Sequence, residues 1–79
     1  MSSVVLFGRP GCHLCDDARE ALAEAEITFT ETDITTDPGL EAEFGTLIPV
    51  VEVAGTPVFF AGMDPRELAE LVEEALEDE

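Results

Sequence analysis

Apolar and polar positions alternate along the chain in patterns that predict several helices and strands. Residues 4–7 form an unbroken apolar run, which is typical of a strand covered on both faces. A second strand is expected over residues 27–32, where Ile27 and Phe29 alternate with threonines. Between the two strands, a helix is expected to start at Cys12, with acidic residues on its polar faces and an apolar stripe formed by Leu14, Ala18, Ala21, Leu22 and Ala25.

The middle of the chain is punctuated by residues that cap helices and form turns. Asp37 and Pro38 have the character of an N-cap and a first helical position, and Gly45 is expected to end that short helix. Residues 48–53 and 57–60 then predict a β-hairpin around a three-residue turn.

The last helix is expected to open at residues 64–67, where Asp64 and Glu67 have the spacing of a capping box around Pro65. The resulting order is β-α-β-α-β-β-α. The first β-α-β unit should place two strands in parallel through a right-handed crossover, and the hairpin should add two antiparallel strands. We therefore expect an α/β fold, with a four-stranded mixed sheet flanked by helices.

Length and charge restrict the possible functions. The 79 residues carry 19 acidic and 3 basic side chains, for a net charge of −16, and 46% of the positions are hydrophobic. This length suits one domain, expected over residues 1–79. All three basic residues are arginines, so the chain lacks the basic patch that nucleic acid or an anionic membrane surface requires.

The acidic residues are spread along the whole chain, which favours adaptation to a salt-rich cytoplasm. At about 1 M salt the Debye length falls to about 3 Å, so repulsion between like charges is largely screened. A docking face for a basic protein and ordinary solubilising charge are the alternatives. No apolar run approaches the roughly 18 residues of a membrane span, and the first residues lack the basic segment of a signal peptide. A cytoplasmic monomer is expected.

Cys12 and Cys15 are the only cysteines, and they lie at the first turn of the first expected helix, directly after a strand. The unpaired N–H groups and the dipole of a helix N-terminus stabilise an anion, and a thiolate is the attacking species in thiol chemistry. We therefore interpret Cys12 as a nucleophile and Cys15 as the resolving thiol of a disulfide-exchanging pair. A purely structural disulfide is disfavoured, because closing so short a loop removes little entropy from the unfolded chain.

A metal site is the main competitor for these cysteines. Cys12, His13 and Cys15 supply three ligands, whereas structural zinc takes four, so zinc or an iron–sulfur cluster would have to be shared between two chains. His13 is either a solvent-facing helix residue or, when protonated, a charge that favours the neighbouring thiolate. The second candidate function is therefore a metal carrier or a binding module without redox turnover. No bound metal or prosthetic group is expected for the first.

Residues 9–16, followed by residues 48–50 and 62–64, resemble the glutaredoxin-like branch of the thioredoxin superfamily, and the match extends over essentially the whole chain. The resemblance implies a thioredoxin-like fold and thiol–disulfide exchange with a protein or small-molecule disulfide. It also implies a cis peptide bond before Pro49, with the backbone of Ile48 pairing with the bound thiol substrate.

Further thiol-binding positions are implied by the same resemblance. Arg9 is similar to the family's basic residue that meets a substrate carboxylate. Gly62 and Asp64 belong to the segment that holds a carboxylate in glutathione-binding members. His13 lies between the cysteines, where such proteins tune their potential. Pro65 departs from the pattern, because it removes one backbone N–H from this segment. The expected electron donor is therefore glutathione, another low-molecular-weight thiol or a protein reductase.

Overall fold

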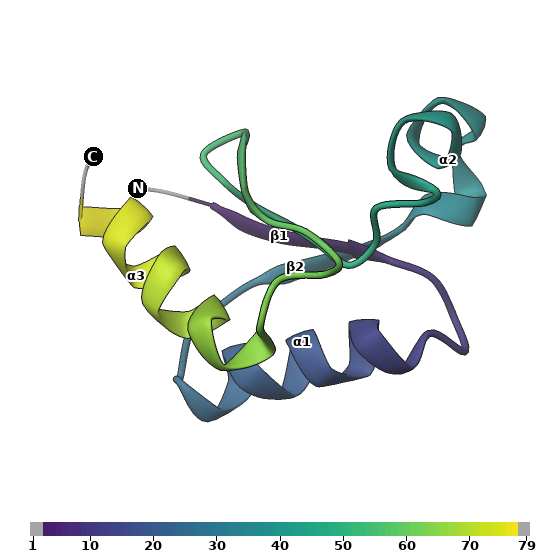
Figure 1. Ribbon diagram of the computed structural model, residues 1–79. Coiled ribbons are helices and arrows are strands. Elements are labelled where there is room, and N and C mark those ends of the chain that lie inside the picture. Colours follow the sequence, from purple (N-terminus) through teal and green to yellow (C-terminus); the bar gives the residue numbers. More distant parts are fainter. Residues whose placement is uncertain (1–2, 78–79) are drawn as a thin grey trace.

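The computed structural model describes residues 3–77, in which helices and strands follow the expected order (Figure 1). The elements are β1 (Val4–Gly8), α1 (His13–Glu24), β2 (Thr30–Asp33), α2 (Pro38–Phe44), β3 (Val50–Val53), β4 (Thr56–Phe59) and α3 (Leu68–Glu77). Two short 3₁₀ turns, Ile34–Thr36 and Pro65–Glu67, precede α2 and α3. Within the described range, no helix combines the length and the apolar character needed to cross a bilayer.

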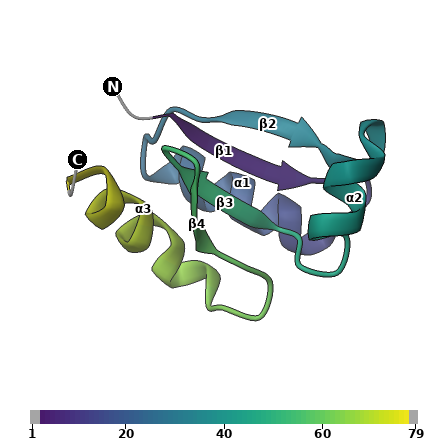
Figure 2. The same cartoon turned by 90° about the horizontal axis from the view of Figure 1, so that it is seen from above.

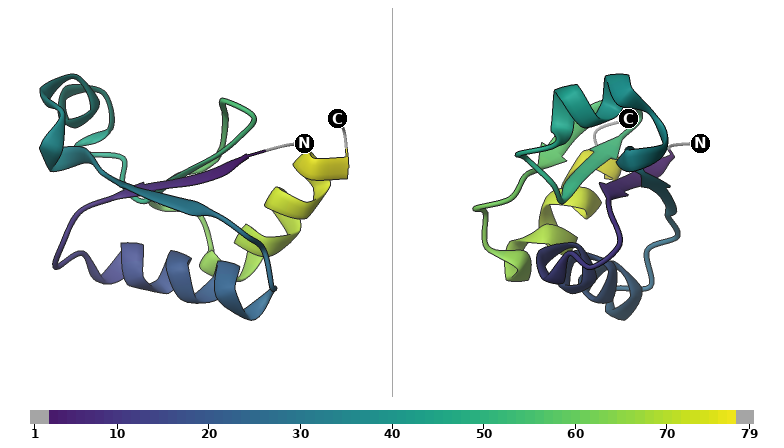
Figure 3. Two further views of the ribbon diagram at one scale, coloured as in Figure 1. Left: turned by 180° about the vertical axis from the view of Figure 1, so that it is seen from behind. Right: turned by 90° about the vertical axis from the view of Figure 1, so that its right-hand side faces the viewer.

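The four strands form one mixed sheet in the order β2-β1-β3-β4. β1 pairs in parallel with β2 and antiparallel with β3, and β4 pairs antiparallel with β3. α1 and α3 lie on one face of this sheet, and α2 lies on the other face beyond the end of β1 (Figures 1 and 2). The view from behind shows the same three layers (Figure 3). The expected four-stranded mixed sheet with flanking helices is confirmed.

The apolar core consists of two clusters. The first, which we call the helix cluster, lies between the sheet and the helices α1 and α3, and its buried members are Val4, Leu6, Ala18, Leu22, Val51, Val53, Phe59, Leu68 and Val72. The second, the cysteine cluster, gathers around the end of β1 and α2, and its buried members are Phe7, Cys15, Ile34, Phe44, Ile48 and Val50. The rings of Phe7 and Phe44 join the sheet to α2, with centroids 4.9 Å apart. Burying each large apolar side chain contributes about 1.5–3 kcal/mol, so both clusters hold the fold together.

The second strand begins later than the sequence predicts. At the end of α1, Glu26 takes a left-handed φ of 58°. The N–H of Ile27 donates to the carbonyl oxygen of Leu22 at 3.0 Å, which is the 6→1 hydrogen bond of a Schellman motif. The chain is therefore still closing the helix at residue 27, and β2 starts at Thr30. Ile27 and Phe29 pack against the helix cluster from outside the sheet.

Two further boundaries differ from those expected. Ile48 and Pro49 precede β3 instead of belonging to it, and Pro49 has no N–H to donate to a strand ladder. The last α-helix begins at Leu68, after the 3₁₀ turn that Asp64 caps. The Asp64 carboxylate accepts a hydrogen bond from the N–H of Arg66 at 2.9 Å.

The hairpin turn between β3 and β4 has two residues, one fewer than expected. Val53 pairs with Thr56, and the intervening Ala54 and Gly55 have φ angles of 53° and 85°. Positive φ at both central positions defines a type I′ turn, in which Asn-Gly is preferred because asparagine tolerates the left-handed conformation better than alanine.

We expect Ala54→Asn to stabilise the protein by about 0.5–1 kcal/mol, because it places a favoured residue at a left-handed position. For a domain of this size, that corresponds to a rise of several degrees in Tm, measured by circular dichroism. Ala23→Asn is the matched control: Ala23 is an exposed residue of α1, where asparagine should lower Tm. A fall in Tm for both variants would contradict the prediction.

Candidate active site

Cys12 is the N-cap residue of α1, at the end of the loop that follows β1. Its backbone is extended (φ −92°, ψ 110°), and its Sγ accepts a hydrogen bond from the N–H of Cys15 at 3.2 Å. The sulfur therefore occupies the place of a capping oxygen, where unpaired N–H groups and the helix dipole favour negative charge. Cys12 is half-buried, so it can meet a reactant from solution.

Cys15 lies one turn into α1, and its side chain is completely buried in the cysteine cluster. The pKa of the Cys15 thiol is raised to about 11, first by burial and then by a hydrogen bond with the Cys12 side chain, while a backbone hydrogen bond from Arg9 opposes the rise. Both cysteines are free thiols. Cys15 therefore keeps its proton at neutral pH while it lies beside the sulfur of Cys12.

The reduced protein is expected to lose stability as the pH rises from 9 to 11. The thiol of Cys15 has an ordinary pKa of 9.0 and a pKa of about 11 in the folded chain. Between these values the unfolded chain has released a proton that the folded chain keeps, which costs up to about 3 kcal/mol of folding free energy. The sequence has neither lysine nor tyrosine, so among its side chains only the cysteines titrate in this range.

Urea unfolding followed by circular dichroism, at several pH values across this range, measures that loss. Cys15→Ser is the control, because it removes the buried thiol and keeps Cys12. An equally steep loss in the Cys15→Ser variant would contradict the assignment to Cys15.

Gly8, the last residue of β1, makes room for Cys15. A Cβ at Gly8 would lie 2.9 Å from the Sγ of Cys15 and 3.2 Å from its Cβ. Such distances are closer than side-chain atoms normally approach, so Cys15 can take this position only because residue 8 has no side chain. Sequence reasoning missed this role, because a glycine at the end of a strand is also an ordinary turn signal.

Three of the predicted thiol-binding residues lie in the cysteine cluster or in a hollow that Leu14 of α1 also lines. The Ile48–Pro49 peptide bond is cis, as the resemblance implies. Ile48 is buried beside Cys15 in the cysteine cluster. Pro49 and Gly62 share a hollow of about 20 Å³, which is lined by Leu14, Pro49, Phe59, Ala61, Gly62, Met63 and Pro65.

The other three predicted residues do not reach this hollow. The side chains of Arg9 and His13 are exposed, and Arg9 meets the site through its backbone hydrogen bond to Cys15. The Asp64 carboxylate is bound by the Arg66 guanidinium at 2.8 Å. Roles for Arg9, His13 and Asp64 in thiol binding stay predictions.

Leu14 and Met63 are the exposed large apolar residues of the hollow, and neither was identified as a site residue from the sequence. Leu14 was expected to lie on the buried stripe of α1, but it is 51% exposed. Met63 is 37% exposed, and its sulfur accepts a hydrogen bond from the N–H of Phe60. Apolar periodicity shows which side of a helix a residue lies on. It does not show whether other residues cover that side at every turn of the helix.

Cys12, His13 and Cys15 do not form a three-ligand group in the described part of the chain. Within residues 3–77, no group of three His, Cys, Asp or Glu side chains is arranged to hold a metal ion. Because Cys15 is completely buried, a metal shared with a second chain could reach only Cys12 and His13 unless α1 rearranged.

Comparison with known proteins adds the family context. Residues 3–78 match the family model described as Glutaredoxin-like domain (DUF836). The chain is similar to the X-ray structure of the structural genomics target protein XcR50 from X. campestris, with 32% identity and a TM-score of 0.79 over 91% of this chain and 97% of that one. It is also similar to glutaredoxin from Brucella melitensis, with 26% identity and a TM-score of 0.64 over 96% and 84% of the two chains.

The crystal structure of oxidized glutaredoxin 2 from Chlamydomonas reinhardtii shares the fold, with 18% identity and a TM-score of 0.68 over 98% of this chain and 81% of that one. A comparison with curated protein sequences gave no match. The expected thioredoxin-like α/β fold is therefore confirmed.

Proposed function

The chain belongs to the Glutaredoxin-like domain family, and on that premise we propose that it is a dithiol oxidoreductase with Cys12 as nucleophile and Cys15 as resolving thiol. The observation that carries the proposal is the asymmetry of the pair. Cys12 is half-buried and accepts an N–H hydrogen bond at the start of α1, whereas Cys15 is completely buried and keeps its proton.

In the reducing direction, the thiolate of Cys12 attacks one sulfur of a substrate disulfide. A disulfide forms between Cys12 and the substrate, and the other substrate sulfur leaves as a thiolate that takes up a proton. Cys15 then loses its proton and attacks the Sγ of Cys12, which forms the Cys12–Cys15 disulfide and releases the second substrate thiol. The two thiols supply both electrons, and the reverse sequence oxidises a substrate dithiol.

The proposed substrate is a protein or small-molecule disulfide, which Ile48, Pro49 and Gly62 position beside Cys12. The electron donor is glutathione, another low-molecular-weight thiol or a protein reductase, and the proposal requires no resident metal or prosthetic group. We propose that the protein works in this way as a cytoplasmic monomer.

A redox titration of metal-free protein tests the proposal. The protein is equilibrated with dithiol buffers of stepped potential, and the free thiols are alkylated and counted by mass. We expect both thiols to disappear together, with a two-electron midpoint between about −120 and −270 mV, the span of known Cys-x-x-Cys catalysts. If no intramolecular disulfide forms at any potential, the oxidoreductase proposal is wrong, and metal binding by the same sample becomes the next measurement.

The proposal includes a salt-rich setting, and it predicts that the protein loses stability below roughly 0.5 M salt. The net charge is −16, and the screening length grows as salt is removed, so repulsion between the carboxylates increases. Tm measured by circular dichroism across a salt series should therefore fall at the low-salt end. A neutral osmolyte in place of salt is the control, and a Tm independent of salt would contradict salt adaptation.

A further inference from the structure

The hollow beside Pro49 is lined mainly by apolar residues. Leu14, which lies between the two cysteines in the sequence, and Met63 are both exposed, and both line the hollow beside Pro49. The hollow of about 20 Å³ has room for a group about the size of a methyl or a water molecule. The exposed side chains of Leu14 and Met63 can contact an apolar group of a substrate beside this hollow. A substrate that matches it carries an apolar side chain close to its reacting sulfur.

The turn before α3 offers no free backbone donor to an anionic ligand. Pro65 has no N–H. The N–H of Arg66 donates to the carboxylate of Asp64 at 2.9 Å, and the N–H of Glu67 donates to the carbonyl oxygen of Asp64 at 2.9 Å. The N–H of Leu68 donates to the carbonyl oxygen of Pro65. A ligand carboxylate would therefore meet the negative charge of Asp64 and no unpaired N–H among residues 65–68.

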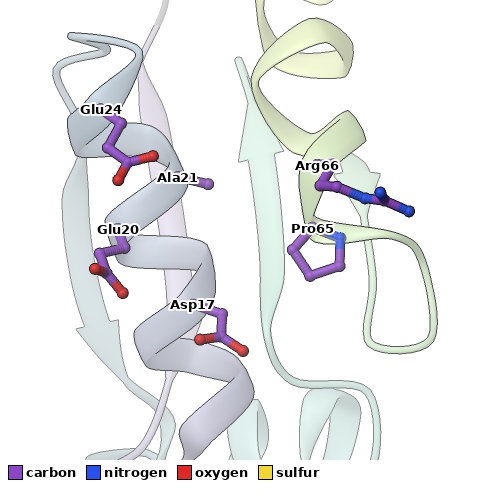
Figure 4. Close-up of a pocket in the computed structure, with 6 residues that line it drawn as sticks. All are labelled: Asp17, Glu20, Ala21, Glu24, Pro65 and Arg66. Carbon is purple, nitrogen blue, oxygen red and sulfur yellow. The ribbon is translucent and has the colours of Figure 1, made fainter.

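An acidic groove adjoins the apolar hollow, between α1 and the turn before α3 (Figure 4). The groove has a volume of about 250 Å³ and is lined by Asp17, Glu20, Ala21, Glu24, Pro65 and Arg66. Pro65 lines both the groove and the hollow.

The carboxylates of the groove have no cationic partner of their own. No salt bridge within residues 3–77 involves Asp17, Glu20 or Glu24. Arg66, on the opposite wall, extends away from α1 in Figure 4 and is paired with Asp64. The charge of the groove therefore complements lysine or arginine side chains of a partner.

Resting on the proposed function, we propose that the substrate is a polypeptide disulfide with an apolar side chain beside its cysteine and basic side chains nearby. The apolar side chain lies on Leu14 and Met63, and the basic side chains lie in the groove formed by Asp17, Glu20 and Glu24. This selects against glutathione disulfide, which carries carboxylates and has no large apolar group. The chemical step is the exchange given above: the Cys12–Cys15 dithiol is oxidised, and the peptide disulfide is reduced to two thiols.

Reduction of matched disulfides tests the proposal. Reduced protein is mixed with the disulfide of a short peptide that carries Leu beside its Cys and two Lys after it, and formation of the Cys12–Cys15 disulfide is followed by rapid alkylation. The comparison disulfides are the same peptide with Leu→Ser, the same peptide with both Lys→Glu, and glutathione disulfide. We expect the Leu/Lys peptide to react at least about tenfold faster than each comparison disulfide in the lowest salt that keeps the protein folded.

A comparison of low and high salt separates the contribution of the charged groove from that of the apolar contact. In 1 M salt the advantage over the Glu peptide should shrink, because the charges are screened, while the advantage over the Ser peptide should remain. Equal rates for the Lys and Glu peptides in low salt, or a faster reaction with glutathione disulfide, would overturn the proposal.

Variants with matched charge locate the effect on the protein. Glu20→Gln combined with Glu24→Gln should slow the Leu/Lys peptide about threefold to tenfold relative to the Glu peptide. Glu73→Gln combined with Glu77→Gln removes the same charge from α3, away from the residues that line the groove, and should leave that ratio unchanged. An equal effect of the two pairs would overturn the groove as the binding surface.

One further oxidant distinguishes a wrong substrate from a wrong function. Hydroxyethyl disulfide, which is small and uncharged, is included as a further oxidant. If it oxidises the pair and the peptides show no preference, the assignment of the substrate is wrong and the oxidoreductase function stands. If no disulfide oxidises the pair, the proposed function itself is wrong.

Discussion

Replacing Cys12 by serine is expected to lower the rate of disulfide reduction by about 10³-fold or more, because it removes the attacking sulfur. Cys15→Ser should have a different result. The hydrogen bond to the Sγ of Cys12 comes from the backbone N–H of residue 15, so it survives the substitution. This variant should complete the first exchange and then stop, with one substrate thiol bound to Cys12. Intact mass measured after mixing with a disulfide counts that adduct directly.

The two variants together separate the roles of the cysteines. Cys12→Ser should form no adduct, and Cys15→Ser should form one adduct per chain, which a dithiol reductant releases. An adduct on Cys15 in the Cys12→Ser variant would reverse the assignment. Full turnover by Cys15→Ser would instead indicate chemistry that uses one thiol.

Gly8→Ala is expected to destabilise the reduced protein by about 1–3 kcal/mol, because it overpacks the cysteine cluster. The added Cβ would lie 2.9 Å from the Sγ of Cys15, so either the thiol or the end of β1 has to move. A displaced Cys15 is also a poorer partner for a disulfide, whose geometry is narrow, so the midpoint potential should change as well. Urea unfolding and the redox titration described above measure the two effects.

A double-mutant cycle assigns this effect to the contact with Cys15. In a Cys15→Ala background the sulfur is absent, and Gly8→Ala should cost less, by a coupling of about 1 kcal/mol or more. The 3.2 Å approach to the Cβ of residue 15 remains, so the cost should not vanish. The same cost in both backgrounds would show that Gly8 is required for the backbone of β1 and not for Cys15.

The elements that the sequence predicted well are those with local physical causes. Asp37 caps α2 with its side chain, Pro38 starts the helix and Gly45 ends it, as expected from the sequence. The position of Cys12 at the start of α1 followed in the same way from the strand and loop before it. Such features depend on a few neighbouring residues, so a single sequence contains them.

The features that the sequence did not reveal depend on an unusual residue or on distant contacts. The end of α1 uses Glu26 in a left-handed conformation that glycine usually takes, so no glycine marks the delayed start of β2. Gly8 and Cys15 are brought together only when α1 folds back along β1. Asp64 pairs with Arg66, and composition does not show which partner a side chain will choose.

The core is divided into two clusters, and only one of them surrounds the sulfur of Cys15. Cys15 shares its cluster with residues of β1, α2 and the segment before β3, while α3 packs on the helix cluster alone. We therefore expect substitutions among the residues beneath α3 to change Tm more than they change the surroundings of the Cys15 sulfur. Substitutions around Phe44 are expected to change the surroundings of the Cys15 sulfur directly, because Phe44 and Cys15 belong to the same cluster. In this arrangement, the stability of the fold and the surroundings of the reacting sulfur can change separately.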